Sequence, residues 1–155
     1  MSELKRAKFE YEYLGEISEE KKINEFYTSI DVFVLPPLEL PNDVEGFGIV
    51  YLEANACGIP VVASKTGGVP DAVKEGISGV FADPTNPKDI ADKILFVINT
   101  LKEWEQRCKE HAKNFDIRKI SKQFRELYGK GFRVIGMSKH NTWVGKPNVL
   151  IERKW

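Results

Sequence analysis

Three short apolar runs, separated by helical patterns, constrain the fold of this chain more than any other feature. The runs are Val32–Leu35, Pro60–Ala63 and Gly79–Ala82. A continuous apolar run of this length predicts a strand that is covered on both faces. Between the first and second runs, Ile49–Ala56 is typical of a helix. Between the second and third runs, Pro70 suits the first turn of another helix. Strands that alternate with helices across short loops predict a parallel, doubly wound α/β sheet, which is a Rossmann-like fold.

The stretch ahead of the first run carries two further signals. Lys8–Leu14 alternates aromatic with charged residues, and a period of two predicts a half-exposed strand. Ser18 predicts the start of a helix, because acidic residues follow it in the first turn, where they suit the helix dipole. We expect this helix to end near Ser29. Its predicted apolar face consists of Ile23, Phe26 and Tyr27.

From Pro87 onward the pattern is helical. Apolar residues at helical spacing predict three amphipathic segments, over 90–98, 101–113 and 117–128. We therefore expect one domain over 1–128.

The extension 129–155 differs in character from the domain before it. It holds six basic residues against one acidic residue, and its aromatic residues include Phe132, Trp143 and Trp155. Its only strand-like piece is Val149–Ile151. We interpret the extension as a segment that packs on the domain or as a disordered end, and docking to a membrane surface or a partner is the alternative.

Composition excludes several classes of protein. The basic and acidic residues are balanced at 23 each, so no overall charge favours nucleic acid. No apolar run reaches the ~20 residues of a membrane helix, and the N-terminus has no signal-peptide pattern. Cys57 and Cys108 lie far apart, and Cys57 is expected to be a buried free thiol, which favours a reducing, cytoplasmic setting. His111 and His140 have no ligand partners at useful spacing, so no metal site is predicted.

The segment Glu45–Glu53 carries the functional prediction. A predicted strand ends at Leu35, and doubly wound sheets bind ligands beyond the carboxyl ends of their strands. The helix expected after Gly48 offers unpaired N–H groups and a partial positive charge, which together make an anion site. Gly46 and Gly48 let a ligand approach the backbone closely.

Two carboxylates lie beside this predicted anion site. They would repel a phosphate, but ionised carboxylates are strong acceptors for hydroxyl groups. Glu45 can bind hydroxyls of a sugar, and Glu53 can bind the two hydroxyls of a ribose. A nucleotide sugar presents a sugar, a diphosphate and a ribose in sequence, so it fits the whole pattern. A second interpretation stays open, in which Glu45 complements the helix dipole and Glu53 is an ordinary solvated residue.

The two glutamates, with seven residues between them, match a family motif, E-x7-E. The residues around them follow the same family order: Tyr13-Leu-Gly15, Ile30-Asp-Val32, Leu35-Pro36, Glu45-Gly-Phe-Gly48, Glu53-Ala54, Cys57-Gly-Ile-Pro-Val-Val62, Thr66-Gly-Gly68 and Gly76-Ile-Ser-Gly79. From about Phe9 to Tyr128 the chain therefore resembles the C-terminal, nucleotide-sugar-binding domain of the retaining GT-B glycosyltransferases (group 1, family 4 type).

The resemblance implies a role for each matching position. Glu45 is implied to contact the transferred sugar as the catalytic residue, and Glu53 to bind the ribose. Backbone N–H groups are implied to meet the sugar or the diphosphate, and they belong to Phe47, Gly48, Ile49 and Val50. The other implied donor-binding residues are Gly46, Ile17 beside the base, and Gly67 and Gly68 in the next strand-to-helix turn.

The resemblance also implies the chemistry. The substrate is a UDP-, GDP- or ADP-sugar, and the sugar is transferred with retention of anomeric configuration. No cofactor and no metal are expected, because positive groups of the protein stabilise the departing diphosphate.

The chain departs from the family pattern in two respects. It lacks an acceptor-binding domain, and it lacks the first strand–helix unit of the donor domain, which brings an Arg and a Lys to the diphosphate. Lys21 or Lys22 is the nearest substitute. We therefore expect part of a longer or split enzyme, which binds its donor weakly and needs an acceptor-binding N-terminal domain in the same or another chain.

Other classes of function were weighed against transfer. A non-catalytic nucleotide-sugar-binding or regulatory module would keep the same site. A dinucleotide-dependent oxidoreductase is disfavoured, because Tyr51 stands where its third glycine would be. No P-loop pattern is present either, and no nucleic-acid partner is expected.

Overall fold

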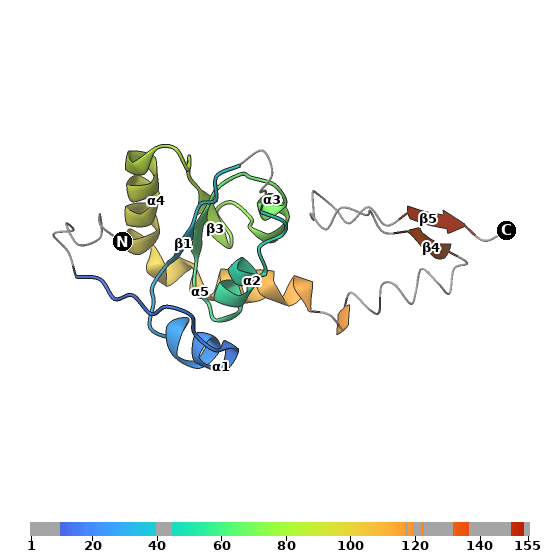
Figure 1. The fold of residues 1–155 in the computed structure, drawn as a ribbon, viewed down its shortest axis with the longest axis horizontal. Helices are drawn as coiled ribbons and strands as arrows, with labels where there is room; N and C mark the ends of the chain where they lie inside the picture. The colour runs from blue at the N-terminus through green and yellow to red at the C-terminus, as the bar shows by residue number, and fades with distance from the viewer. Residues whose placement is uncertain are drawn as a thin grey trace.

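The computed structural model describes residues 10–39, 45–116, 118–119, 122, 132–136 and 150–153 of the 155-residue chain. Its centre is a parallel sheet of three strands in the order β1-β2-β3 (Figure 1). The strands are β1 (Phe33–Leu35), β2 (Val61–Ala63) and β3 (Gly79–Phe81). All three coincide with the apolar runs in the sequence, so the predicted parallel α/β sheet is confirmed.

Helices cover both faces of this sheet (Figure 1). On one side lie α2 (Ile49–Ala56) and α3 (Val69–Ala72), and on the other lies α4 (Pro87–Asn99). Successive side chains of a strand point to opposite faces, and β2 shows this plainly. Val61 and Ala63 belong to the core cluster of α2 and α3, whereas Val62 belongs to the cluster that contains Val97 of α4. The predicted doubly wound arrangement is therefore confirmed.

Strand β1 is less covered than its sequence predicts. Val34 and Leu35 are each 37% exposed, whereas Val61 and Val62 of β2 are fully buried. Edge position is not the whole reason, because β3 lies at the other edge of the described sheet and its Val80 is only 3% exposed. Val80 packs in the core cluster that contains Val97 of α4.

The predicted strand over Lys8–Leu14 is wrong for the residues that the structure describes. Residues 10–14 form no strand, and Tyr13 is 72% exposed; residues 8 and 9 lie outside the described residues. An alternating pattern becomes a strand only where a neighbouring strand accepts its backbone hydrogen bonds. No such pairing reaches residues 10–14 in the described sheet.

The predicted helix after Ser18 is present, but its second half is wider than an α-helix. The helix α1 (Glu19–Lys21) continues into the π-helix η2 (Lys22–Phe26). The Lys21 N–H donates to Ser18 Oγ at 3.3 Å, which confirms the serine cap. Phe26 and Tyr27 pack into the core as expected, but Ile23 is 48% exposed. The i→i−5 hydrogen bonding of a π-helix changes which side chains share a face, so the expectation for Ile23 was wrong.

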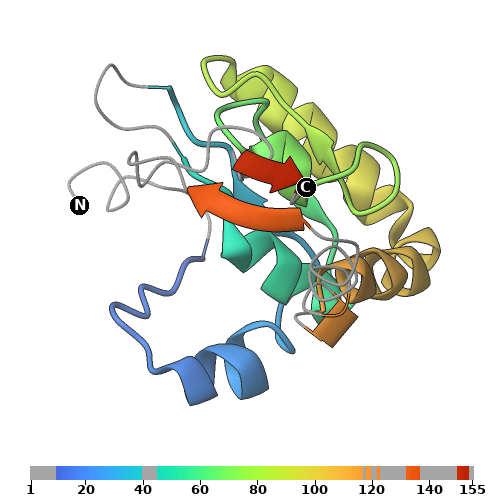
Figure 2. The same cartoon turned by 90° about the vertical axis from the view of Figure 1, so that its right-hand side faces the viewer.

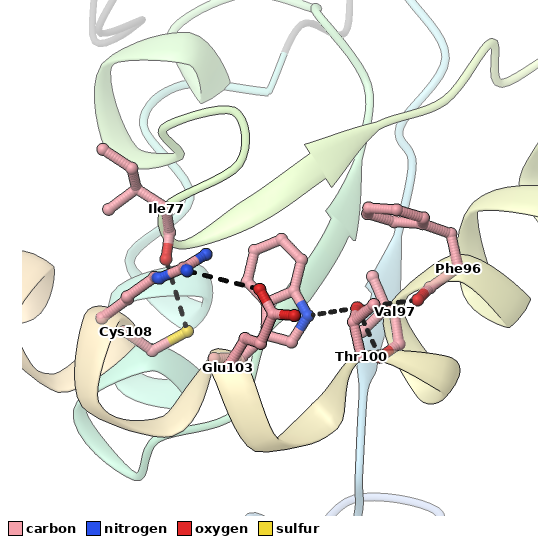
Figure 3. A network of polar contacts seen from close by, with 8 residues as sticks. Ile77, Phe96, Val97, Thr100, Glu103 and Cys108 are labelled. Carbon is pink, nitrogen blue, oxygen red and sulfur yellow. Dashed lines mark hydrogen bonds and ion pairs between the residues drawn. The ribbon is translucent and has the colours of Figure 1, made fainter.

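After α4 the chain continues as short helices. They are η3 (Leu101–Glu103), α5 (Glu105–Ala112) and η4 (Lys113–Phe115). Thr100 forms the corner between α4 and η3: its hydroxyl donates to Phe96 O at 2.8 Å and accepts from Trp104 Nε1 at 2.9 Å (Figure 3). The segment predicted over 90–98 lies within α4, as expected, but its Leu95 and Ile98 are 57% and 43% exposed. The segment predicted over 101–113 is helical but is interrupted at Trp104. In the segment predicted over 117–128, residues 118, 119 and 122 are helical and the others lie outside the described residues.

Within the extension, β4 (Phe132–Gly136) and β5 (Leu150–Arg153) form an antiparallel pair (Figure 2). Leu150 and Ile151 confirm most of the strand expected over Val149–Ile151, and Val149 lies outside the described residues. The sequence pattern missed β4. In the part of the chain that the structure describes, no helix is long and apolar enough to cross a membrane.

Candidate functional site

The loops after β1 and β2 are tied together at the carboxyl edge of the sheet. The carbonyl oxygen of Pro37 accepts hydrogen bonds from Ser64 Oγ at 2.6 Å and from Thr66 Oγ1 at 3.2 Å. Further along, the Gly68 N–H donates to the carbonyl oxygen of Glu45 at 3.3 Å. The structure therefore brings Glu45 and the Gly67–Gly68 turn together, at the edge where doubly wound sheets bind ligands.

Gly48 forms the start of α2. Its backbone is left-handed, with φ 72° and ψ 63°, and it is the N-cap of the helix. A Cβ at this position would overlap the ring of Tyr51, so the sequence needs glycine here for both conformation and space. No side chain caps this end of α2. The Tyr51 N–H donates to the carbonyl oxygen of Gly48 at 3.0 Å, whereas the N–H groups of Ile49 and Val50 at the start of the helix are available to a ligand or to solvent.

Tyr51 fixes this helix start against the sheet. Its side chain is fully buried, and its hydroxyl donates to the carbonyl oxygen of Leu35 at 2.8 Å. Burial raises the pKa of this phenol strongly, and the Glu45 carboxylate raises it further. Tyr51 therefore stays a protonated donor. Sequence reasoning missed this role, because it used Tyr51 only to reject a dinucleotide fingerprint.

Glu53 lies on the next turn of α2, where its carboxylate contacts Lys22 of η2 and Tyr27, the residue that follows η2. Tyr27 Oη donates to Glu53 Oε2 at 2.9 Å, and Lys22 Nζ lies 3.1 Å from the same oxygen. The Glu53 side chain is 26% exposed and that of Lys22 is 18% exposed, so this ion pair is largely shielded from solvent. Glu53 is thus not an ordinary solvated residue.

The two lysines proposed as substitute cations differ in the structure. Lys22 pairs with Glu53, whereas Lys21 lies 3.9 Å from Glu25 as an exposed pair. Exposed pairs of that kind contribute little to stability. Lys22 is therefore the lysine that the fold places at the predicted site.

Phe47 connects the glycine-flanked turn to the C-terminal helices. Its ring packs on Phe115 with centroids 5.7 Å apart. Phe115 in turn packs on His111 at 5.2 Å, and His111 Nε2 lies 2.9 Å from the carbonyl oxygen of Ala72. The ring of Phe47 is a packing group, and His111 is a buried structural residue.

The remaining predicted residues are placed as follows. Gly46 and Ile17 are half-buried, and their contacts with a ligand stay predictions. Cys57 is half-buried, not buried as expected, whereas Cys108 is the buried thiol. Among the described residues no group of three or more His, Cys, Asp or Glu side chains can hold a metal ion; His140 lies outside them.

The parallel sheet with helices on both faces is the Rossmann-like α/β domain of the GT-B glycosyltransferases. The chain belongs to the family described as glycosyl transferases group 1, whose model matches residues 3–115. An uncharacterized glycosyltransferase of Methanocaldococcus jannaschii is 37% identical over 94 residues, which are 59% of this chain and 27% of that protein. The chain thus spans less than a third of that relative.

Solved structures give the same assignment. Sucrose-phosphate synthase from Thermosynechococcus elongatus superimposes with a TM-score of 0.62 at 28% identity, over 75% of this chain and 29% of that one. The HepE protein of Anabaena, in complex with UDP and glucose, gives a TM-score of 0.60 at 25% identity, over 76% of this chain and 31% of that one.

Proposed function

We propose that this chain binds a nucleoside-diphosphate sugar and contributes the donor site for its transfer with retention of configuration. The observation that carries the proposal is that α2 begins directly after Gly48 without a side-chain cap. Glu53, which accepts a hydrogen bond from Tyr27, lies on the same helix. The amides of Phe47, Gly48, Ile49 and Val50 bind the diphosphate, and Glu53 binds the ribose.

The remaining positions complete the donor site. Glu45 contacts the transferred sugar beside the Gly67–Gly68 turn, to which its carbonyl group is bonded. Gly46 admits the ligand to the backbone, and Ile17 lines the base pocket. A carboxylate beside the sugar accepts its hydroxyl groups, while the helix N-terminus offsets the charge of the departing diphosphate. No cofactor takes part in this proposal.

Uridine is the first base to test. HepE of Anabaena, which shares the fold and 25% identity, is in complex with UDP and glucose. We propose UDP-sugars as the leading donor class, with GDP- and ADP-sugars as the alternatives.

The proposal is tested by ligand-observed NMR on the 155-residue chain with UDP-glucose, GDP-mannose and ADP-glucose. Binding in the millimolar range to one of the three is expected, because Lys22, the lysine that lies at the predicted site, is paired with Glu53. Glucose 1-phosphate serves as a control that carries sugar and phosphate without a nucleoside. If none of the three nucleotide sugars binds more tightly than this control, the proposed function is wrong.

Transfer itself is proposed to need a second, acceptor-binding domain, in the same chain or in another. The alternative is a non-catalytic module that binds the donor alone. Measuring sugar transfer by the chain with and without candidate acceptor domains separates the two. The cytoplasmic setting and the peripheral membrane contact of residues 129–155 stay predictions.

A further inference from the structure

Tyr27 and Lys22 lie far from Glu53 in the sequence but meet its carboxylate in the fold. Tyr27 Oη lies 2.9 Å from Glu53 Oε2. Lys22 Nζ lies 3.1 Å from the same Oε2 and 3.4 Å from Oε1. We propose that Tyr27 is the positioning residue that presents Glu53 to the ribose, with Lys22 as its charge partner. This inference rests on the proposed function, since it assigns the residues that prepare Glu53 for the donor.

The ring of Tyr27 is held rigidly. It is 1% exposed, and it packs against Phe26 and Phe33, with ring centroids 5.3 Å and 5.9 Å away. A buried aromatic side chain in such a cluster has little rotational freedom. The position of its hydroxyl, and so of its hydrogen bond, is therefore set by the core.

Among the described contacts, the hydroxyl proton of Tyr27 can be donated to either of two oxygens. The carbonyl oxygen of Val50 lies 3.4 Å away, whereas Glu53 Oε2 lies 2.9 Å away. The shorter distance and the charge of the carboxylate both favour Glu53 as the acceptor. Tyr27 thus fixes the rotamer of a side chain that is only partly buried.

This arrangement leaves Glu53 able to accept further hydrogen bonds. A carboxylate offers about four lone-pair positions. Tyr27 and the shorter Lys22 contact both fall on Oε2, so Oε1 is the less engaged oxygen. Two neighbouring hydroxyls of a ribose need such a fixed, partly free carboxylate. Lys22 also offsets the negative charge that would otherwise repel a diphosphate bound one turn away.

A purely structural role is the competing explanation. In that case the Tyr27–Glu53 bond only ties the N-terminal helix to α2, and losing it loosens the whole site. The two explanations differ in one measurable quantity. A positioning role acts only on the ribose hydroxyls, whereas a structural role weakens binding of any nucleotide equally.

The test compares a ribonucleotide with its 2′,3′-dideoxy counterpart. UDP and 2′,3′-dideoxy-UDP are titrated into the wild-type chain and into Tyr27→Phe, with the corresponding GDP or ADP pair if one of those bases is preferred. We expect the wild type to favour the ribonucleotide by about tenfold, the effect of losing hydrogen bonds to a charged acceptor. Tyr27→Phe is expected to reduce this preference at least about threefold and to leave the affinity for the dideoxynucleotide unchanged.

Three further variants sharpen the result. Glu53→Gln abolishes most of the preference, and adding Tyr27→Phe to it has no further effect if the two residues act together. Lys22→Met keeps the length of the side chain and reduces the preference without disturbing the aromatic cluster, so it tests the inference even if Tyr27→Phe folds poorly. Tyr13→Phe, at a position that is 72% exposed, is the matched control and leaves the preference unchanged.

Several outcomes would overturn the inference. An equal loss for both nucleotides in Tyr27→Phe and Lys22→Met would make the contact structural, and an unchanged preference in both would make it irrelevant to the ribose. If the wild type binds both nucleotides equally, Glu53 does not bind the ribose hydroxyls, although the proposed diphosphate site at the start of α2 would still be supported. If the wild type binds no nucleotide, both the proposed function and this inference are wrong.

Discussion

The hydroxyl of Tyr51 donates a hydrogen bond of 2.8 Å to the carbonyl oxygen of Leu35, the last residue of β1. This contact joins the first turn of α2 to the end of the strand that precedes it in the sheet. Because Tyr51 is fully buried, this contact fixes the position of the start of α2 relative to the carboxyl edge of the sheet. The predicted anion site therefore depends on a side chain that does not itself face the ligand.

Replacing Tyr51 with phenylalanine removes this bond and keeps the ring. We expect Tyr51→Phe to lower the free energy of unfolding by about 1 kcal/mol, the usual net value of one buried hydrogen bond. Urea denaturation followed by circular dichroism measures it. Tyr11→Phe, at a position that is 48% exposed, is the control and is expected to change nothing. A loss in the control as large as that in Tyr51→Phe would contradict this account of the contact.

Gly48 and Gly76 form a matched pair for testing the turn. Both have φ 72°, but a Cβ at Gly76 meets nothing within 4 Å, whereas a Cβ at Gly48 overlaps the Tyr51 ring. Gly76→Ala is expected to cost about 1–2 kcal/mol, the penalty of a left-handed backbone for alanine. Gly48→Ala pays the same penalty and must also displace a buried ring, so its cost is expected to be clearly larger. Thermal or urea unfolding measures both, and equal losses would show that the Tyr51 ring moves aside freely.

The apolar runs predicted the strands because burial there is local and complete. Val61, Val62 and Ala63 are all fully buried, and a continuous apolar run is the direct signature of that environment. Tyr11 and Tyr13 show the opposite case. Their alternation with charged residues satisfies the pattern of a strand, but a strand also needs a partner, and a single-segment pattern carries no information about one.

The candidate site also has a part that was predictable from the sequence and a part that was not. Glu45, Gly48 and Glu53 are close in the sequence, so their spacing on one turn and helix was predictable. The partners of Glu53 were not, because Tyr27 lies 26 residues away and Lys22 lies 31 residues away. Such contacts arise only when the N-terminal helix packs on α2. The same holds for Ser64, whose bond to Pro37 joins two loops 27 residues apart.

Cys108 gives the fold a predictable response to alkaline pH. Burial raises the pKa of its thiol to about 12, whereas an unfolded cysteine has a pKa of about 8.5. The folded state therefore keeps the proton while the unfolded state loses it. The stabilising contribution of this group is complete below about pH 8.5 and is lost progressively as the pH rises toward 12.

We expect the wild-type chain to lose more stability between pH 8 and pH 10 than Cys108→Ala does. Urea unfolding of both proteins at the two pH values measures how much the free energy of unfolding of each protein changes with pH. The cavity that Cys108→Ala creates lowers the stability of the variant equally at both pH values, so it does not affect this comparison. Identical pH slopes would contradict the burial of this thiol.

Glu53 is expected to contribute directly to donor affinity. Glu53→Ala should weaken nucleotide-sugar binding by ~1–3 kcal/mol, because it removes charge-assisted hydrogen bonds to the ribose. Ligand-observed NMR on the variant measures the loss. Glu110→Ala, which removes an exposed glutamate bonded only to Gln106 among the contacts seen at that position, is the matched control and should bind like the wild type. If Glu53→Ala binds like the wild type as well, Glu53 lies outside the site.

The most direct measurement of the central claim is a titration of the ¹⁵N-labelled chain with UDP, or with GDP or ADP if that base is preferred. A diphosphate bound at the start of α2 must perturb the amides that point at it. The account predicts that the largest amide shifts fall on Phe47, Gly48, Ile49 and Val50, with Gly68 next to them. Shifts that are spread evenly over the surface, or that concentrate away from this helix start, would contradict it.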